Sequence, residues 1–129
     1  MRPMFDWLNA GKDSVTLDLS TEAGQAALHR LADGCDVVME GFRPGVAARL
    51  GCDADTLRGR NPDLVYCSIS AFGQEGPRRS QPAHDLNVQA LAGVCHLARD
   101  ADGTPHGLPL PVADLSAAQA AAHQSAKLL

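Results

Sequence analysis

The fold of this chain is indicated first by residues 14–40, SVTLDLSTEAGQAALHRLADGCDVVME. The stretch Ser14–Leu19 alternates apolar and polar residues as a half-buried strand does, and Ser20-Thr21 then offers side-chain oxygens that can cap a helix. The alanine and leucine spacing predicts a helix over 22–32, and Cys35–Glu40 is typical of a second strand. Strand, helix and strand in this order predict a right-handed crossover unit of a parallel sheet.

The same succession of helices and strands continues downstream. Short apolar runs bounded by glycine, proline and aspartate favour an α/β class, with a Rossmann-like parallel sheet and flanking helices. The further elements predicted are helix 46–50, a turn capped by Asp53, strand 64–69, helix 86–94 capped by Asp85, and helix 115–129.

Both ends of the sequence suggest an incomplete domain. The chain begins with a loop that leads into a strand, without an earlier strand and helix of its own. The last predicted helix reaches Leu129 without a cap or a stop signal. We therefore expect residues 1–129 to be a fragment of one domain.

The composition narrows the possible partners. A net charge of −4 and only 4% aromatic residues disfavour a nucleic acid. The apolar stretches are too short to cross a bilayer and the N-terminus has no signal-peptide core, so we expect a cytoplasmic protein without a membrane partner. The four cysteines form no C-x-x-C pair and the five histidines no H-x-x-x-H pair, so we expect free, buried thiols and no metal site.

Three segments follow the predicted strands, at the carboxyl ends where ligands of open α/β sheets bind. They are Asp18–Ser20, Gly41–Arg43 and Ser70–Gly76. The side chains of Arg43 and Arg49 offer cations to a phosphate-bearing ligand, although two solvated arginines fit the spacing as well. The glycines after the third strand match neither a Walker loop nor a dinucleotide fingerprint, and they fit a plain surface turn equally.

His84 and Asp114 are the candidate catalytic residues. His84 precedes a predicted helix, whose amide dipoles favour a neutral imidazole that can accept a proton. Asp114 ends an apolar segment and precedes a helix, a position that suits an acid or a nucleophile. Each residue also has a plainer interpretation, as a loop histidine without a role and as a helix N-cap. Together the two side chains indicate proton transfer on a small molecule.

With these motifs the sequence resembles the class III coenzyme A transferases of the CaiB/BaiF type, a superfamily that includes the α-methylacyl-CoA racemases. The matching segments run in order through nearly the whole chain, which makes the resemblance specific. They are residues 8–19, 32–46, 49–51, 61–66, 68–77, 83–90 and 111–114, including ADGCDVVMEGFRPGV at 32–46 and SISAFGQEGP at 68–77.

The resemblance implies a longer protein. Members of the superfamily begin with a further strand and helix, and they continue into a second domain and a returning C-terminal segment that interlocks two subunits as a homodimer. Residues 1–129 would then be a partial CoA-binding domain of the nucleotide-binding type, from the inner part of the first domain. Its first strand–helix unit and the second domain would be absent.

The resemblance also implies roles for His84 and Asp114. In the racemases, one of the two removes the α-proton of a 2-methylacyl-CoA to give a thioester enolate, and the other returns a proton to the opposite face. In the transferases the aspartate is instead a nucleophile, which passes CoA between carboxylic acids through an aspartyl-CoA thioester, and the histidine is dispensable. His84 favours the racemase, whereas residues 115–118, LSAA, are more typical of a transferase.

The implied substrate is an acyl-CoA thioester, with no metal and no permanently bound cofactor. A third possibility is that this chain alone is catalytically silent, because the missing parts would leave a sheet edge and one side of the cleft uncovered.

Two residues depart from the racemase pattern: Ala83 stands in place of a glycine, and Val88 stands in place of a frequent tyrosine. The residues that the resemblance places against the CoA thioester are Leu17, Asp18, Leu19, Ser20, Gly41, Phe42, Arg43, Arg49, Ala83, Asp85, Leu86, Asn87 and Val88.

Overall fold

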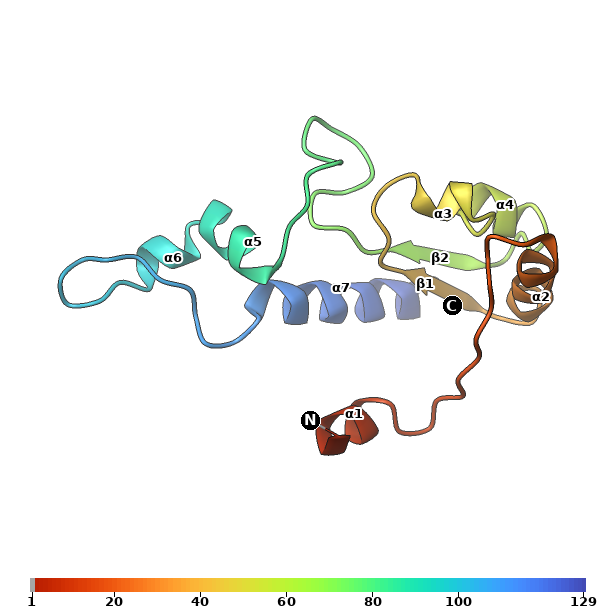
Figure 1. Cartoon of the computed structure of the whole chain (residues 1–129), viewed down its shortest axis with the longest axis horizontal. Coiled ribbons are helices and arrows are strands. Elements are labelled where there is room, and N and C mark those ends of the chain that lie inside the picture. Colours follow the sequence, from red (N-terminus) through yellow and green to blue (C-terminus); the bar gives the residue numbers. More distant parts are fainter. Residues whose placement is uncertain (1) are drawn as a thin grey trace.

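The computed structural model describes residues 2–129, an elongated arrangement of helices around a small sheet (Figure 1). Two strands form the sheet, and a long C-terminal helix runs beneath it in this view. The elements in chain order are α1 (Arg2–Leu8), α2 (Glu22–Ala32), β1 (Val37–Glu40), α3 (Val46–Arg49), α4 (Ala54–Arg58), β2 (Val65–Ser68), α5 (Asp85–Leu91), α6 (Val94–Leu97) and α7 (Val112–Leu128).

The sheet is parallel, as the sequence predicts. Val37 of β1 lies opposite Val65 of β2, and the register runs to Glu40 opposite Ser68. The crossover between the two strands contains α3 and α4, which lie on one side of the sheet, and α7 packs against β2 (Figure 1). The carboxyl ends of both strands therefore reach the same edge.

Helix α2 has the predicted bounds, and its first turn explains how it starts. The Thr21 hydroxyl oxygen accepts the Gly24 N–H at 3.1 Å, which satisfies one of the free amides of the helix start. The turn before the helix lies directly on Gly24, because a Cβ at that position would come within 1.9 Å of the Asp18 carbonyl oxygen. Only glycine fits this contact.

The strand predicted over 14–19 is wrong. Residues 12–18 have no regular secondary structure, and Val15 is 65% exposed. A strand needs a hydrogen-bonded neighbour, and within residues 2–129 none lies beside this segment. The apolar alternation survives in part, since Leu17 and Leu19 are half-buried and Leu19 packs on the core.

The start of the chain and the bounds of two later helices also differ from the prediction. The chain opens with helix α1 rather than a loop, and an extended segment separates α1 from the rest (Figure 1). The helix predicted to reach residue 94 ends at Leu91, because Gly93 adopts a φ of +82° and α6 begins after it. Helix α7 begins at Val112, three residues before its predicted start at Leu115.

The core lies between the sheet and helices α2 to α4. Its buried apolar residues are packed against half-buried neighbours such as Tyr66, whose hydroxyl donates to the Cys52 carbonyl at 2.9 Å. Cys52 is the buried thiol, but Cys35 is exposed and the other two cysteines are half-buried, so the prediction of buried thiols holds only for Cys52. The buried apolar residues are Ala32, Ala47, Cys52, Leu57 and Leu64.

Candidate active site

A cavity of about 490 Å³ lies where the carboxyl ends of β1 and β2 meet the starts of α5 and α7. Four separate segments contribute to its wall, so the tertiary structure creates it. Its lining residues are Gly41, Phe42, Arg43, Pro44, Ile69, Ser70, Ala71, Phe72, Arg79, Gln81, Pro82, Ala83, His84, Val88, Ala113, Asp114 and Ala117.

The strand side of the cavity is fixed by Glu40, the last residue of β1. One carboxylate oxygen accepts the Phe42 N–H at 2.6 Å, and the other accepts the hydroxyl of Ser68, the last residue of β2. The carboxylate therefore joins the ends of both strands and holds the turn that carries Arg43.

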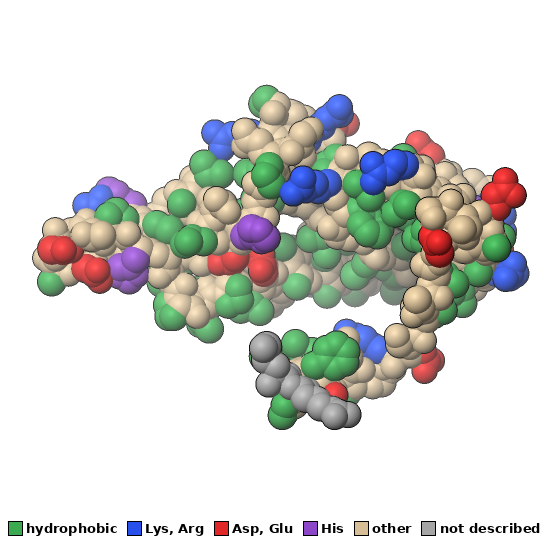
Figure 2. All heavy atoms as spheres, in the orientation of Figure 1, with side chains coloured by type: hydrophobic (Ala, Val, Ile, Leu, Met, Phe, Trp, Pro, Cys, Tyr) green, Lys and Arg blue, Asp and Glu red, His purple; other side chains and the backbone are tan. Residues whose placement is uncertain are grey.

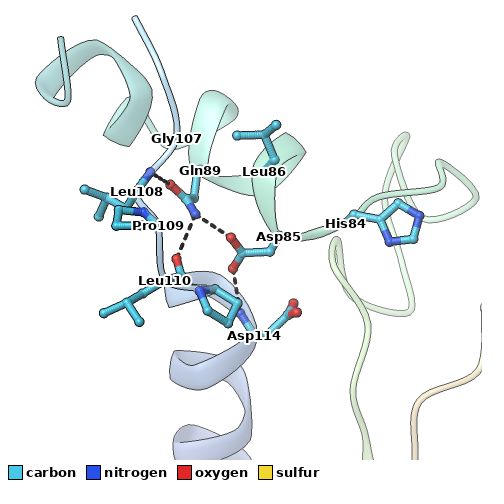
Figure 3. Close-up of a pocket in the computed structure, with 10 residues that line it drawn as sticks. His84, Asp85, Leu86, Gln89, Gly107, Leu108, Pro109, Leu110 and Asp114 are labelled. Carbon is cyan, nitrogen blue, oxygen red and sulfur yellow. Dashed lines mark hydrogen bonds between the residues drawn. The ribbon is translucent and has the colours of Figure 1, made fainter. Parts of the chain in front are cut away.

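His84 stands immediately before α5, as predicted. It is the N-cap residue in extended conformation, and its backbone N–H donates to Asn87 Oδ1 at 3.2 Å. Asp85, which was predicted to cap α5, is instead the first helical residue. In Figure 3 the His84 ring and the Asp85 carboxylate leave the chain on opposite sides, with the carboxylate directed towards Gln89 and the start of α7.

Asp114 lies in the first turn of α7, with its side chain exposed. The N-cap of α7 is Pro111, so the interpretation of Asp114 as an N-cap is wrong. Asp85 Oδ1 takes the capping role from outside the helix, because it accepts the backbone N–H groups of Ala113 at 2.7 Å and of Asp114 at 3.1 Å. The Asp114 carboxylate has no part in this capping, and Asp114 lines the cavity.

The second oxygen of Asp85 binds the buried amide of Gln89. Gln89 Nε2 donates to Asp85 Oδ2 and, at 3.2 Å, to the Leu110 carbonyl, while Gln89 Oε1 accepts the Leu108 N–H at 2.9 Å (Figure 3). Burial opposes ionisation of Asp85, but the hydrogen bonds from Gln89, Asp114 and Ala113 outweigh it and hold the pKa of this carboxyl below its usual value.

A second, more open hollow of about 500 Å³ lies on the far side of the His84-Asp85 dipeptide, between α5 and the loop that precedes α7. Its wall contains Gln89 and residues 107–111, and both His84 and Asp114 border it as well as the first cavity. The two candidate catalytic residues are therefore common to both walls, and Figure 3 shows them among the residues of the second hollow.

The structure brings together some of the residues that the resemblance places against CoA. Those that line the first cavity are Gly41, Phe42, Arg43, Ala83 and Val88, and those that line the second hollow are Asp85 and Leu86. The remainder, Leu17, Asp18, Leu19, Ser20, Arg49 and Asn87, lie outside both walls.

In the segment Asp18–Ser20 the polar groups form hydrogen bonds with one another inside a turn. Asp18 Oδ1 accepts the Ser20 hydroxyl at 2.6 Å and the Ser20 N–H at 3.0 Å. These hydrogen bonds, with that of the Ser20 hydroxyl the strongest, lower the pKa of the Asp18 carboxyl. The turn lies against α2 through the contact with Gly24.

The lining residues that were not singled out from the sequence include Arg79 and Gln81. The signal that could have found them is the Arg78-Arg79 pair inside the loop after the third predicted strand. Figure 2 shows that Lys and Arg side chains gather over this loop and α3. Ser70 adds a buried hydroxyl oxygen at the cavity that has no hydrogen-bond partner among residues 2–129, a polar group that a ligand could satisfy.

Two features that would suggest other classes of site are absent from the described part of the chain. Residues 2–129 contain no cluster of three or more His, Cys, Asp or Glu side chains that could hold a metal ion. No helix within the same residues has the length and apolar character needed to span a bilayer.

Known proteins are similar to this chain in both sequence and fold. The fatty acyl-CoA transferase Rv3272 of Mycobacterium tuberculosis, described as probable, is 45% identical over 106 residues, covering 82% of this chain and 27% of the relative. A crystal structure of Rv3272 superposes with a TM-score of 0.83 at 43% identity, covering 89% of this chain and 33% of the solved one.

Two further relatives differ in the reaction that their names state. A succinyl-CoA:mesaconate CoA-transferase of Haloarcula hispanica is 41% identical over 115 residues, 86% of this chain and 29% of the relative. The human α-methylacyl-CoA racemase is 42% identical over 87 residues, 67% of this chain and 23% of the relative. The chain thus spans about a quarter of the length of the curated relatives it matches.

The family itself is identified by a match over almost the whole chain. The family model described as CoA-transferase family III fits residues 1–126. This match agrees with the relatives, with the solved structures and with the motifs at 32–46 and 68–77. The chain belongs to CoA-transferase family III.

Proposed function

We propose that the cavity binds an acyl-CoA thioester and that His84 and Asp114 exchange the α-proton of a 2-methylacyl-CoA. One observation carries this proposal: His84 from the start of α5 and Asp114 from the start of α7 line the same cavity. A histidine and a carboxylate that border one ligand site are the pair that stepwise proton removal and return require.

The reaction needs one group on each face of the α-carbon. One group takes the α-proton, the electrons of the broken C–H bond move to the thioester oxygen, and an enolate forms. The other group gives a proton to the opposite face of the same carbon, and the electrons return to the C–H bond, which inverts the centre. Polar groups beside the developing oxygen lower the barrier, and the unpaired Ser70 hydroxyl is suited to this role.

The charges at the cavity suit the phosphates of coenzyme A. Arg43 and Arg79 both line the wall, and a guanidinium binds phosphate oxygens in a bidentate fashion. Phe42 and Phe72 add apolar surface for the acyl chain. The other predicted contacts, Leu17 to Ser20, Arg49 and Asn87, stay predictions.

A second candidate is CoA transfer between carboxylic acids, which the names of relatives such as Rv3272 favour. Asp114 would attack the acyl-CoA carbonyl and expel the CoA thiolate, which leaves a mixed anhydride. The thiolate would then form the aspartyl-CoA thioester and release the acid, and an acceptor carboxylate would reverse both steps. His84 has no required part in this sequence.

Two measurements separate these reactions. In D2O, the longest reading frame that contains this chain should exchange the α-proton of 2-methylpropanoyl-CoA for deuterium, and both His84→Ala and Asp114→Asn should lower the rate at least ~100-fold. His123→Ala, on the same helix as Asp114 but outside both walls, is the matched control. No exchange by the unsubstituted protein would exclude the racemase.

The transferase predicts a covalent adduct. Hydroxylamine or borohydride should trap an acyl or CoA adduct on Asp114 during turnover, and His84→Ala should leave that adduct in place. Absence of the adduct would exclude the transferase. Calorimetric titration of the 129-residue chain with coenzyme A tests whether it binds at all, and measurable binding would exclude the silent-fragment alternative for the binding step.

A further inference from the structure

We propose that Asp85 and Gln89 position the reacting groups of this site, Asp85 by binding the first turn of α7 and Gln89 by holding Asp85 in place. The inference rests on the proposed function, because it concerns the geometry of His84 and Asp114. Asp85 belongs to the residues that the resemblance places against CoA, and the structure suggests a different role for it.

The Asp85 carboxylate accepts three hydrogen bonds from within the protein. Its Oδ1 accepts two backbone N–H groups, those of Ala113 and of Asp114 itself, and its Oδ2 accepts the Gln89 amide. Hydrogen bonds from N–H groups to an ionised oxygen are among the strongest in a protein. A carboxylate with these partners fixes the start of α7 and has little capacity left for a ligand.

Gln89 holds the Asp85 carboxylate from the other side. We call Asp85, Gln89 and the hydrogen bonds between them and the start of α7 the Asp85–Gln89 clamp. Its side chain is only 2% exposed, and its amide makes three hydrogen bonds, to Asp85, to Leu108 and to Leu110. The loop lies tightly on α5 here, since a Cβ on Gly107 would come within 2.4 Å of Leu86 Cδ1. Gln89 thereby ties the loop before α7 to the same helix that presents His84.

Both candidate catalytic residues are linked to this clamp through the backbone. His84 directly precedes Asp85 in the chain, and Asp114 donates its own backbone N–H to the Asp85 carboxylate (Figure 3). A displacement of Asp85 therefore changes the separation between the two side chains, and a misplacement of about 1 Å at a reacting centre costs on the order of 100-fold in rate. The fully buried side chains of α5 and α7 are the polar Gln89 and Ser125, so no fully buried apolar side chain of these two helices adds to this constraint.

The test uses Asp85→Asn and Gln89→Met in the longest reading frame that contains this chain. Asparagine has one oxygen and one NH2 group, so in either orientation its NH2 group faces a donor, the Gln89 NH2 group or the backbone N–H groups of Ala113 and Asp114. Methionine keeps the length of the glutamine but removes its donor and acceptor. Asp102→Asn is the matched control, because Asp102 also accepts a backbone N–H, from Thr104 at 3.0 Å, in an exposed turn outside both walls.

We expect each variant to lower kcat about 10- to 100-fold with KM changed less than about threefold. The double variant should lose no more than the worse single one, because the residues act as one unit. An unchanged kcat in both variants would overturn the inference, and so would a rise in KM at constant kcat, which would assign Asp85 to substrate binding. If Asp85→Asn does not fold, Gln89→Met decides. Inactivity of the unsubstituted protein in both reactions is a failure of the proposed function instead.

Discussion

The chain has two halves that differ in what they bury. The first half runs to the end of β2 at Ser68, and the second comprises residues 84–129. The buried apolar residues of the core all lie between Ala32 and Leu64, around the sheet and helices α2 to α4. In residues 84–129 the buried side chains are Gln89 and Ser125, both polar. The first half has a buried apolar core, and in the second the hydrogen bonds of the Asp85–Gln89 clamp join α5 to the start of α7.

This difference bears on where a site can be built. Apolar burial stabilises a fold but is not directional, whereas hydrogen bonds fix atoms at a set distance and angle. The cavity lies at the joint, with the strand ends of the first half on one side and the starts of α5 and α7 on the other. The strand ends of the first half and the hydrogen-bonded helices α5 and α7 together bring groups from both halves to the cavity.

The largest effect is expected where the two halves meet. Asp114→Asn should lower turnover at least ~100-fold in either proposed reaction, because both need its carboxylate. The free energy of unfolding should change by less than about 1 kcal/mol, since the side chain is exposed. Steady-state kinetics and urea unfolding check the two parts. A variant that loses activity because it is largely unfolded, as urea unfolding would reveal, would show that Asp114 supports the fold.

The first half should respond most strongly to loss of apolar volume. Leu57→Ala removes a side chain that is 1% exposed and should lower the free energy of unfolding by about 3 kcal/mol. Leu115→Ala, at 56% exposure in the second half, is the control and should cost less than about 1 kcal/mol. Equal losses, measured by thermal or urea unfolding, would contradict the contrast between the halves.

A smaller loss is expected from the close contact under the Asp18 turn. Gly24→Ala places a methyl group 1.9 Å from a backbone oxygen, so the turn must move, at a cost of about 1–3 kcal/mol. Gly34→Ala meets its nearest atom, the Leu31 carbonyl oxygen, at 3.8 Å and serves as the control. Thermal unfolding of both variants measures the difference. A Gly24→Ala variant as stable as the Gly34→Ala variant would contradict the packing of this turn.

The smallest effect is expected when the pH is lowered through the pKa of Asp85. Burial opposes ionisation of Asp85, but its hydrogen bonds prevail and lower its pKa in the folded protein. Its contribution to stability is therefore complete above the unfolded pKa of about 3.9, and it is lost as the pH falls through the lower folded value. The NMR amide shifts of Ala113 and Asp114 should move in that range, and Asp85→Asn should abolish the change. Movement centred above pH 4 would contradict a lowered pKa.

The sequence predicted local elements well where local chemistry decides them. Helix 22–32 has its capping threonine, and β1 and β2 follow their apolar runs, so their existence and their parallel pairing were predictable. The strand over 14–19 was predicted wrongly because pairing depends on a neighbour that periodicity does not reveal. His84 and Asp114 were chosen from their residue types and from the resemblance, and their place on one cavity is a finding of the structure.

The amino-acid sequence by itself determined the family, the α/β class and the two candidate catalytic residues, because motifs, periodicity and caps are properties of short segments. Only the tertiary structure decided the partners of Asp85. A carboxylate at the start of one helix can cap that helix or another, and both fit the same local sequence. Its bond to α7 exists because residues far apart in the chain meet in space. These long-range hydrogen bonds place the start of α7 beside α5 at the cavity.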